Sequence, residues 1–436
     1  MKSKLLLIAA LMSAVAVQAR TDEVSLSDTL SMSLDQCLDM ALGYNYTKQS
    51  VVLDEDTRQA DLKQSKMEFA PDISANLSEN VSRTNADGTN WNGSYDLSAS
   101  MTLFQGGELL TTLKQNKMIY EQTRLQTQQY NNELTISVLE SFLTALGYEE
   151  LLSYQETIAE SSRQQAEEGK VKYEAGKILE SDYLLLEAQY ATDKDNVTTT
   201  RINLENTLVN LKNLMAMDLS QQIKLISPDD AVLEAMLTIP TREEVVFRGM
   251  ETMPEVKISD YNVQIAEKSV RIAKSGYYPT ITLNGGIGTG HAVDFSRYGN
   301  QLSDRFGPQG GITVSIPIFN RNRTQTNVKQ SKIALQQAEL EYKQSIKDIE
   351  QTLINEYGEV LSTMSRYKAS AIKENAYYSS FMAYTEKFKA GAITTVQLLQ
   401  QQNDYISAVN DYVQNKYTFM LQRKILDVRI GEEVRM

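Results

Sequence analysis

The residues able to carry out chemistry are few and far apart in this chain. Cys37 is the only cysteine and His291 the only histidine in 436 residues. A catalytic thiol needs a neighbouring base, and a metal site or a Ser–His relay needs more histidine than one residue supplies. Cys37 lies in a helical pattern, where free cysteine behaves as a small buried hydrophobe, and His291 follows glycines in an expected loop. We therefore expect no catalytic residue, no metal site and no cofactor.

Other signatures of an enzyme or a nucleic-acid-binding protein are missing from the sequence. It has no glycine-rich phosphate loop after an expected strand. The paired acids Glu149-Glu150 and Glu167-Glu168 are expected on solvated faces of helices. The formal net charge of −13 argues against a nucleic-acid partner, whose phosphates attract Lys and Arg. The function must therefore be inferred from the helices and strands that the sequence predicts, and not from catalytic residues.

The first residues predict export. Lys2 and Lys4 precede an apolar stretch, and Val17-Gln18-Ala19 has the form of a cleavage site, so residues 1–19 are predicted to be a signal peptide. No later apolar run has the length of a transmembrane helix.

An internal repeat runs through the rest of the chain. Two landmarks recur 208 residues apart: a capping-box pattern at Ser33 and Thr241, and a proline at 71 and 279. Two others recur 215 residues apart: an aromatic residue at Phe104 and Phe319, and a glycine at 176 and 391. A constant shift with one seven-residue step indicates a duplication, with the insertion between about 290 and 309. We expect a first repeat at 20–226, a linker at 227–240 and a second repeat at 241–436. Each repeat reads as short helix, strand, strand, long helix, break and second helix.

Four segments alternate between apolar and polar residues, as amphipathic strands do. They cover about residues 73–81, 95–103, 280–287 and 312–318. Each has about the length of a tilted strand that crosses a membrane, roughly 9–11 residues. Four strands cannot close a membrane barrel, so other copies of the chain must pair with their edges. A soluble four-stranded sheet packed on helices is the alternative.

Two helices are too long for a globular domain. Residues 107–168 and 322–387 contain no proline and one internal glycine each, so each predicts a helix of roughly 60 residues and about 90 Å. Each helix is predicted to end near Gly176 or Gly391, and Ser181 or Thr394 can cap the helix that follows. The result is two helical hairpins per chain, with apolar spacing like that of coiled coils. A fibrous coiled coil would not explain the strands.

The sequence resembles the TolC-type outer-membrane efflux protein family over about residues 28–434. The resemblance depends on the order and spacing of several motifs. These are the double repeat, Pro71 and Pro279 before strands, Leu103-Phe104-Gln105-Gly106-Gly107 and Pro317-Ile318-Phe319-Asn320 after strands, and the tips Tyr173-x-x-Gly176 and Lys387-Phe388-x-x-Gly391-x-x-Thr394.

The resemblance implies a mostly α, α+β membrane protein that forms a homotrimer. Long helical hairpins form a periplasmic α-barrel, and four strands from each of three chains form a 12-stranded β-barrel. It implies location in the outer membrane of a Gram-negative bacterium, in contact with outer-membrane lipid. It also implies an exit duct that works with a periplasmic adaptor and an inner-membrane pump, such as an RND or ABC transporter, in efflux or type I secretion.

The resemblance also implies roles for individual residues. The adaptor would dock on the hairpin tips, at Tyr173, Gly176, Lys177, Phe388, Gly391 and Thr394. Asp182 matches an acidic residue just past the first tip that is involved in holding the entrance shut, and Glu180 is a further source of negative charge at this gate. Gln397 and Gln400 stand where well-known members of the family carry acids, so an acidic, cation-selective ring is not expected there. The alternative is a periplasmic adaptor-like coiled-coil protein, although adaptors usually have one hairpin flanked by β domains.

Overall fold

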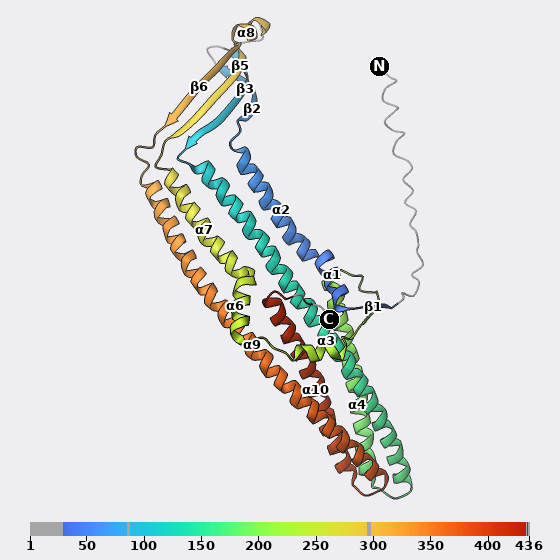
Figure 1. Ribbon diagram of the computed structural model, residues 1–436. Helices are drawn as coiled ribbons and strands as arrows, with labels where there is room; N and C mark the ends of the chain where they lie inside the picture. The colour runs from blue at the N-terminus through green and yellow to red at the C-terminus, as the bar shows by residue number, and fades with distance from the viewer. Residues whose placement is uncertain (1–28, 85–87, 294–297, 433, 435–436) are drawn as a thin grey trace, which may run out of the picture.

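The chain is elongated, with a sheet at one end and helical hairpins at the other (Figure 1). The computed structural model describes residues 29–84, 88–293, 298–432 and 434. The predicted signal peptide, residues 1–19, lies outside the described residues. Within the described ranges, no helix is both long and apolar enough to cross a membrane.

Sixteen elements follow one another along the described chain. In order they are β1 (Leu30–Met32), α1 (Leu34–Tyr44), α2 (Tyr46–Met67), β2 (Asp72–Thr84), β3 (Gly88–Gln105), α3 (Glu108–Glu174), α4 (Glu180–Leu214), β4 (Ile223–Leu225), α5 (Asp230–Met236), α6 (Arg242–Thr252), α7 (Pro254–Ser275), β5 (Thr280–Val293), α8 (Tyr298–Asp304), β6 (Gly307–Ser315), α9 (Arg323–Lys389) and α10 (Thr395–Arg429).

The helix lengths confirm the predicted duplication. α1 and α6 have 11 residues each, and α2 and α7 have 22. α3 and α9 have 67 residues each, and α4 and α10 have 35. The long helices extend to within a few residues of the tip glycines, so each is about 100 Å long rather than the predicted 90 Å. The seven-residue helix α8 lies between β5 and β6, in the region where the sequence predicted the inserted step.

The two predicted capping boxes differ in detail. At α1, Ser33 accepts a hydrogen bond from the amide of Gln36, whose side chain accepts one from the amide of Ser33. At α6, Thr241 accepts from the amide of Glu244. The Glu244 carboxylate lies 3.8 Å from Arg248, one turn along the helix.

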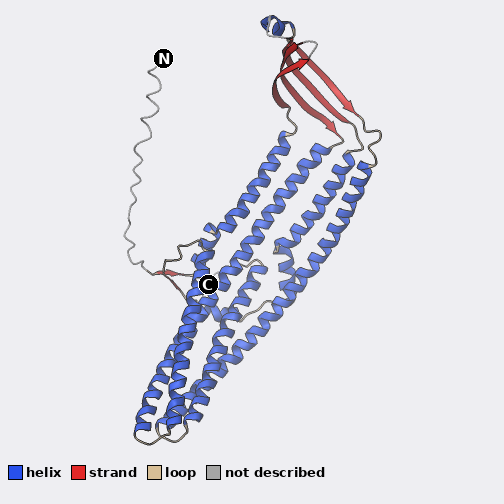
Figure 2. Ribbon diagram, turned by 180° about the vertical axis from the view of Figure 1, so that it is seen from behind, coloured by secondary structure: helices blue, strands red, loops and turns tan. Residues whose placement is uncertain are grey.

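The sheet is antiparallel, in the order β2-β3-β5-β6. Its first three strands have 13, 18 and 14 residues, longer than the sequence predicted. One face carries exposed apolar side chains, including Ile73, Leu77, Ile287 and Ile312. Helices α2, α3, α7 and α9 continue from one end of the sheet (Figure 2), which differs from the alternative of a sheet covered by helices.

The other face of the sheet carries a ladder of polar side chains. Ser74 and Ser98 are hydrogen-bonded at 3.0 Å, and the Asn76 amide donates to Asp96 at 3.0 Å. The Asn284 amide donates to Thr313 at 3.2 Å. The predicted division into an apolar and a polar face is therefore present in the β2–β3 and β5–β6 pairs.

His291 corrects one expectation from the sequence. It lies in β5 and is buried rather than in a loop, because α8 folds over this end of the sheet. Its ring lies 3.0 Å from the carboxylate of Glu79 and in edge contact with Tyr298 of α8. Glu79, the one break in the alternation of β2, thus has a partner on the apolar face.

The strand boundaries match the sequence landmarks at three places and differ at the fourth. Pro71 and Pro279 directly precede β2 and β5, and Phe104 lies beside the end of β3, after a bulge. β6, however, ends at Ser315, four residues before Phe319. Ser315 pairs with Thr280, the first residue of β5, so the partner strand ends at this point.

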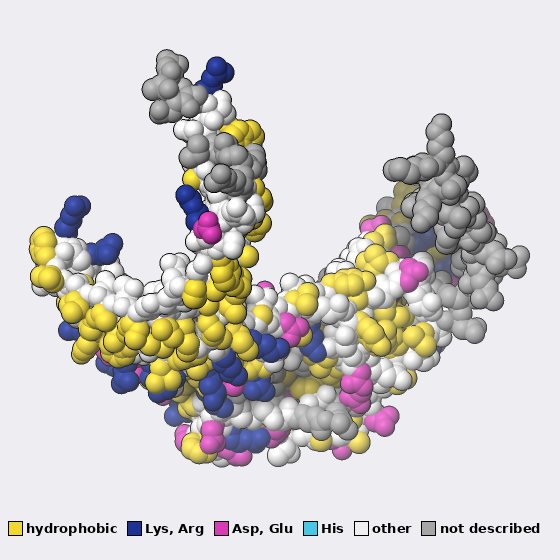
Figure 3. All heavy atoms as spheres, turned by 90° about the horizontal axis from the view of Figure 1, so that it is seen from above, with side chains coloured by type: hydrophobic (Ala, Val, Ile, Leu, Met, Phe, Trp, Pro, Cys, Tyr) yellow, Lys and Arg dark blue, Asp and Glu magenta, His cyan; other side chains and the backbone are white. Residues whose placement is uncertain are grey.

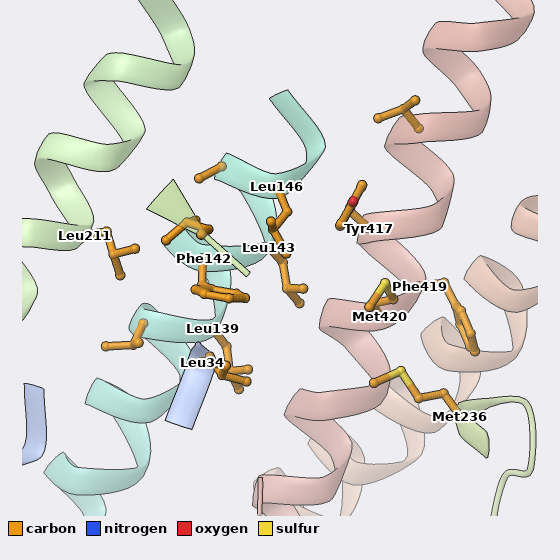
Figure 4. Close-up of a cluster of buried hydrophobic side chains, with 14 of the residues drawn as sticks. Leu34, Leu139, Phe142, Leu143, Leu146, Leu211, Met236, Tyr417, Phe419 and Met420 are labelled. Carbon is orange, nitrogen blue, oxygen red and sulfur yellow. The ribbon is translucent and has the colours of Figure 1, made fainter. Parts of the chain in front are cut away.

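A core of buried apolar side chains lies where α3, α4 and α10 come together (Figure 4). Phe142 of α3, Leu211 of α4 and Phe419 of α10 are all fully buried there. A small parallel pair, β1 with β4, and helix α5 lie beside this core, and the sequence did not predict them. Strands of three residues are too short to show an alternating apolar and polar pattern. Their pairing joins residues that are almost 200 positions apart in the sequence.

Candidate functional site

The two hairpin tips lie together at the end of the molecule opposite the sheet (Figure 1). Both turns use the same backbone geometry. Gly176 and Gly391 have φ angles of +69° and +73°. The next amide, of Lys177 or Ala392, donates to the carbonyl five residues earlier at 2.8 Å. This is the Schellman motif, which ends a helix with a left-handed residue, as the glycines predicted.

The helices that leave the two turns begin differently. α10 begins with a capping box in which Thr394 accepts from the Gln397 amide and the Gln397 side chain accepts from the Thr394 amide at 3.0 Å. α4 begins after Leu179, whose side chain makes no capping hydrogen bond. The expected cap at Ser181 is therefore wrong, because the helix already includes Glu180 and Ser181.

Lys172 joins the two tips, although the sequence did not single it out. Its ammonium group donates to the carbonyl of Phe388 at 3.0 Å and lies 4.3 Å from the centre of that ring. Glu168 holds the same ammonium at 2.8 Å. Phe388 is only 3% exposed, so it anchors one hairpin against the other. A basic residue in the last turn of a helix is the signal that could have indicated it.

A cavity of about 530 Å³ lies between the tips. It brings together six of the predicted site residues, namely Gly176, Lys177, Asp182, Phe388, Gly391 and Thr394. Lys172, Lys389, Ile178 and Ile393 also line it, so it has cationic and apolar walls beside one carboxylate.

The other four predicted site residues lie outside the lining of this cavity. Tyr173 stacks on Tyr183 at 5.9 Å between ring centres. Glu180 and Gln397 are exposed in the first turns of α4 and α10. Gln400 is also exposed, and its amide donates to Asp404 at 3.2 Å. An acid, Asp404, thus lies one turn after Gln400, which stands where the resemblance places an acid.

A buried polar cluster joins the hairpins above the tips. The Ser162 hydroxyl donates to Asp193 at 2.5 Å, and the Gln402 amide donates to Ser162 at 2.6 Å and to Asp193 at 2.8 Å. Gln189 also donates to Asp193, at 2.9 Å. These residues come from α3, α4 and α10, and Gln402 is 0% exposed. Burial raises the pKa of the Asp193 carboxyl, although the three hydrogen bonds act in the opposite direction.

A second polar contact corrects the expectation that Glu150 is solvated. Its carboxylate accepts from Lys416 at 2.7 Å and from the Tyr417 hydroxyl at 2.8 Å. Gly147 lies against the same tyrosine, since a Cβ atom there would be 3.2 Å from its ring. This contact holds α3 to α10 between the core and the polar cluster.

Cys37, which was considered first as a possible catalytic residue, belongs to the apolar core. Cys37 is buried, as predicted, and burial raises the pKa of its thiol to about 12, so it remains protonated at neutral pH. Among the residues that the structure describes, no three of His, Cys, Asp and Glu form a group that could hold a metal ion.

Comparison with known sequences identifies a family profile that matches both halves and relatives that match about 40% of the chain. The profile described as "Outer membrane efflux protein" matches residues 38–216 and 251–429. SilC of Salmonella typhimurium, a probable outer membrane lipoprotein, is 22% identical over 190 residues, 42% of this chain and 36% of SilC. CusC of Escherichia coli K12, a cation efflux system protein, is 21% identical over 187 residues, 41% of this chain and 38% of CusC. The matched part thus spans little more than a third of each relative.

Solved structures resemble almost the whole chain. A structure of CusC has a TM-score of 0.79 at 16% identity and covers 92% of both chains. The Campylobacter jejuni CmeC outer membrane channel has a TM-score of 0.75 at 16% identity, with 91% of this chain and 85% of CmeC covered. These likenesses confirm the predicted fold. Because the family profile covers most of both halves, the chain belongs to the outer membrane efflux protein family.

Proposed function

We propose that this chain is one subunit of an outer-membrane exit duct that passes cargo from an inner-membrane pump out of a Gram-negative cell. The open, amphipathic sheet is the observation that carries the proposal. β2 and β6 are its edges, and one face is apolar and exposed. In a bilayer each unpaired edge group costs several kcal/mol, so the edges must pair with other chains.

The number of strands favours a homotrimer. Two copies of the four-stranded sheet would give eight strands, a barrel whose interior side chains fill. Three copies give twelve strands and room for a channel lined by the polar ladder of Ser74, Asn76 and Asn284. The long helices would continue this channel for about 100 Å into the periplasm.

The proposed division of the chain follows from the same duplication. Residues 1–19 would be removed on export, residues 20–226 and 241–436 would form the two repeats, and residues 227–240 would link them. The duct itself would carry out no chemistry, and an RND or ABC pump would supply the energy.

The hairpin tips are the proposed adaptor-docking surface and gate. The cavity between them offers Lys172, Lys177 and Lys389 beside apolar side chains, which suits an adaptor segment with acidic and apolar residues. Glu180, Asp182, Gln397 and Gln400 would face the entrance where the tips of three subunits converge. Opening would separate neighbouring hairpins without unfolding them.

Native mass spectrometry of the detergent-extracted protein tests the assembly. We expect three copies of the mature chain, and we expect the same preparation to produce ion conductance in planar lipid bilayers. A monomer that stays in water without detergent would contradict the proposal, and so would an eight-stranded dimer without conductance.

The gate residues are tested by Gln397→Asp combined with Gln400→Asp. Carboxylates at these positions in three subunits should shift the reversal potential in a salt gradient toward cation selectivity. The control is Gln397→Asn with Gln400→Asn, which shortens the same side chains without adding charge. An equal shift in both variants would show that charge at this site does not set selectivity.

A further inference from the structure

Positive charge is concentrated in one zone of an otherwise acidic chain. The whole sequence has 43 Lys and Arg against 56 Asp and Glu. The four segments where helices meet strands, residues 62–71, 106–118, 266–279 and 319–334, hold eleven Lys and Arg against three acids. The rest of the chain keeps 32 Lys and Arg against 53 acids. We call these four segments the basic belt.

The belt lies at one level of the molecule. It contains the last turns of α2 and α7 and the first turns of α3 and α9. These four helices lie side by side and all meet the same end of the sheet (Figure 2). Charges separated by some 200 residues in sequence are therefore neighbours across one layer.

The cations of the belt have no partners of opposite charge among the residues that the structure describes. In the described ranges, none of the eleven makes an ion pair within 4.0 Å or donates a side-chain hydrogen bond. One of the three acids, Glu108, already accepts hydrogen bonds from Gln105 and Ser275. Repulsion among these cations destabilises the folded protein, and a bound external anion would reduce that repulsion.

Exposed aromatic residues lie at the edge of the belt that is nearest to the sheet. Phe69, Tyr277, Tyr278 and Phe319 are all exposed and lie between helix and strand. Aromatic side chains prefer the interface between lipid and water. Viewed from the sheet end, the apolar side chains form a band along the convex edge, and Lys and Arg side chains lie just beyond it (Figure 3). The belt thus lies at the expected level of lipid headgroups.

We infer that the basic belt binds anionic phospholipid headgroups in the leaflet that faces the periplasm. The inference depends on the proposed function, because the sheet must span the membrane for the belt to reach headgroups. Long Lys and Arg side chains can lie along apolar surface and place their charges among phosphates. The ligand class is therefore an anionic phospholipid such as phosphatidylglycerol, held by charge and not by a shaped pocket.

The test compares two variants on the same helix. Arg323→Gln, Lys329→Gln and Lys332→Gln together remove three exposed charges from the belt. Lys343→Gln, Lys347→Gln and Lys368→Gln remove three exposed charges farther along α9. Lys343 follows Lys332, the last charge of the belt on this helix, by eleven residues, or about 16 Å, twice the screening length of about 8 Å at physiological salt.

The readout is native mass spectrometry of the full detergent-solubilised protein, titrated with phosphatidylglycerol and phosphatidylethanolamine. We expect preferential retention of phosphatidylglycerol, lost in 0.5 M salt. The belt variant should bind phosphatidylglycerol about 10- to 100-fold more weakly, whereas the control variant should bind as the unchanged protein does.

Three outcomes would overturn the inference. The belt variant could retain phosphatidylglycerol fully, both variants could lose it equally, or soluble peptidoglycan fragments could bind the belt while phosphatidylglycerol does not. The same spectra give the number of protein copies. A trimer without lipid preference contradicts only the belt, whereas a water-soluble monomer contradicts the proposed duct.

Discussion

The two long hairpins can be compared residue by residue, because α3 and α4 match α9 and α10 at a constant shift of 215 positions. Left-handed backbone occurs at the same places in both. Gly106 matches Arg321, with φ angles of +58° and +56°, and Ala216 matches Gly431, with φ angles of +53° and +73°. Each hairpin thus has a non-glycine residue where the other has glycine. Backbone geometry has persisted through the duplication while local sequence has changed.

The interiors of the hairpins differ more than their backbones. The first hairpin has Ser162 and Asp193 facing each other. The matching positions in the second are Tyr377 and Ala408, and Ala408 is fully buried. The polar pair of the first hairpin accepts Gln402 from the second, so the difference between the repeats creates the contact that joins them.

The largest effect is expected from removing this contact. Asp193→Ala leaves one N–H of the Gln402 amide and the hydroxyl of Ser162 buried without their acceptor, which should lower the free energy of unfolding by about 2–4 kcal/mol. Circular dichroism during heating measures it as a lower midpoint. Asp195→Ala, at an exposed position on the same helix, is the control and should change little. Equal midpoints for the two variants would mean that the cluster does not stabilise the junction.

The next effect separates backbone strain from steric conflict at the top of α3. A Cβ atom at Gly106 would lie 2.7 Å from the carbonyl oxygen of Ser275, whereas one at Gly107 would have no atom within 4 Å. Both residues have positive φ. Gly107→Ala should cost about 1 kcal/mol from strain alone, and Gly106→Ala about 2–3 kcal/mol. If both cost the same in thermal unfolding, the close approach of the Ser275 carbonyl has no energetic consequence.

A smaller change, a gain in stability, is expected at Ala216, where the second repeat has Gly431. Ala216 ends α4 with a left-handed φ, and Ala216→Gly should stabilise the protein by about 0.5–1 kcal/mol. Ala175→Gly, where φ is −83°, serves as the control and should give no gain. Equal midpoints for Ala216→Gly and the unchanged protein would show that Ala216 adopts this backbone without strain.

The sequence predicted those parts of the structure that follow from a local period or a special residue. Alternation located the strands, and the glycines at 176 and 391 located the tips, because only glycine adopts their φ without cost. It missed β1 and β4, which pair only through distant contacts. It also missed the cluster around Asp193, since an acid on a polar helix has the same local pattern whether it is solvated or buried by another hairpin.

The smallest effect is a difference in pH dependence. The folded protein raises the pKa of Asp193 above its unfolded value of about 3.9, so the folded state binds this proton more tightly. Stability from this group is therefore greatest below the unfolded pKa and declines as pH rises through the folded pKa. The decline should be modest because Ser162, Gln189 and Gln402 all donate to the carboxylate and offset part of the cost of burial.

Asp193→Asn tests the sign of this dependence. Thermal midpoints of the variant and the unchanged protein, measured from pH 4 to pH 7, should differ by an amount that changes with pH, because only the unchanged protein ionises here. Relative to the variant, the unchanged protein should become less stable as pH rises. A change in the opposite direction would mean that the three hydrogen bonds outweigh burial. Ser162, Gln189 and Gln402 would then stabilise the ionised carboxylate more than burial destabilises it. The carboxylate that distinguishes the first hairpin from the second would add stability at neutral pH instead of removing it.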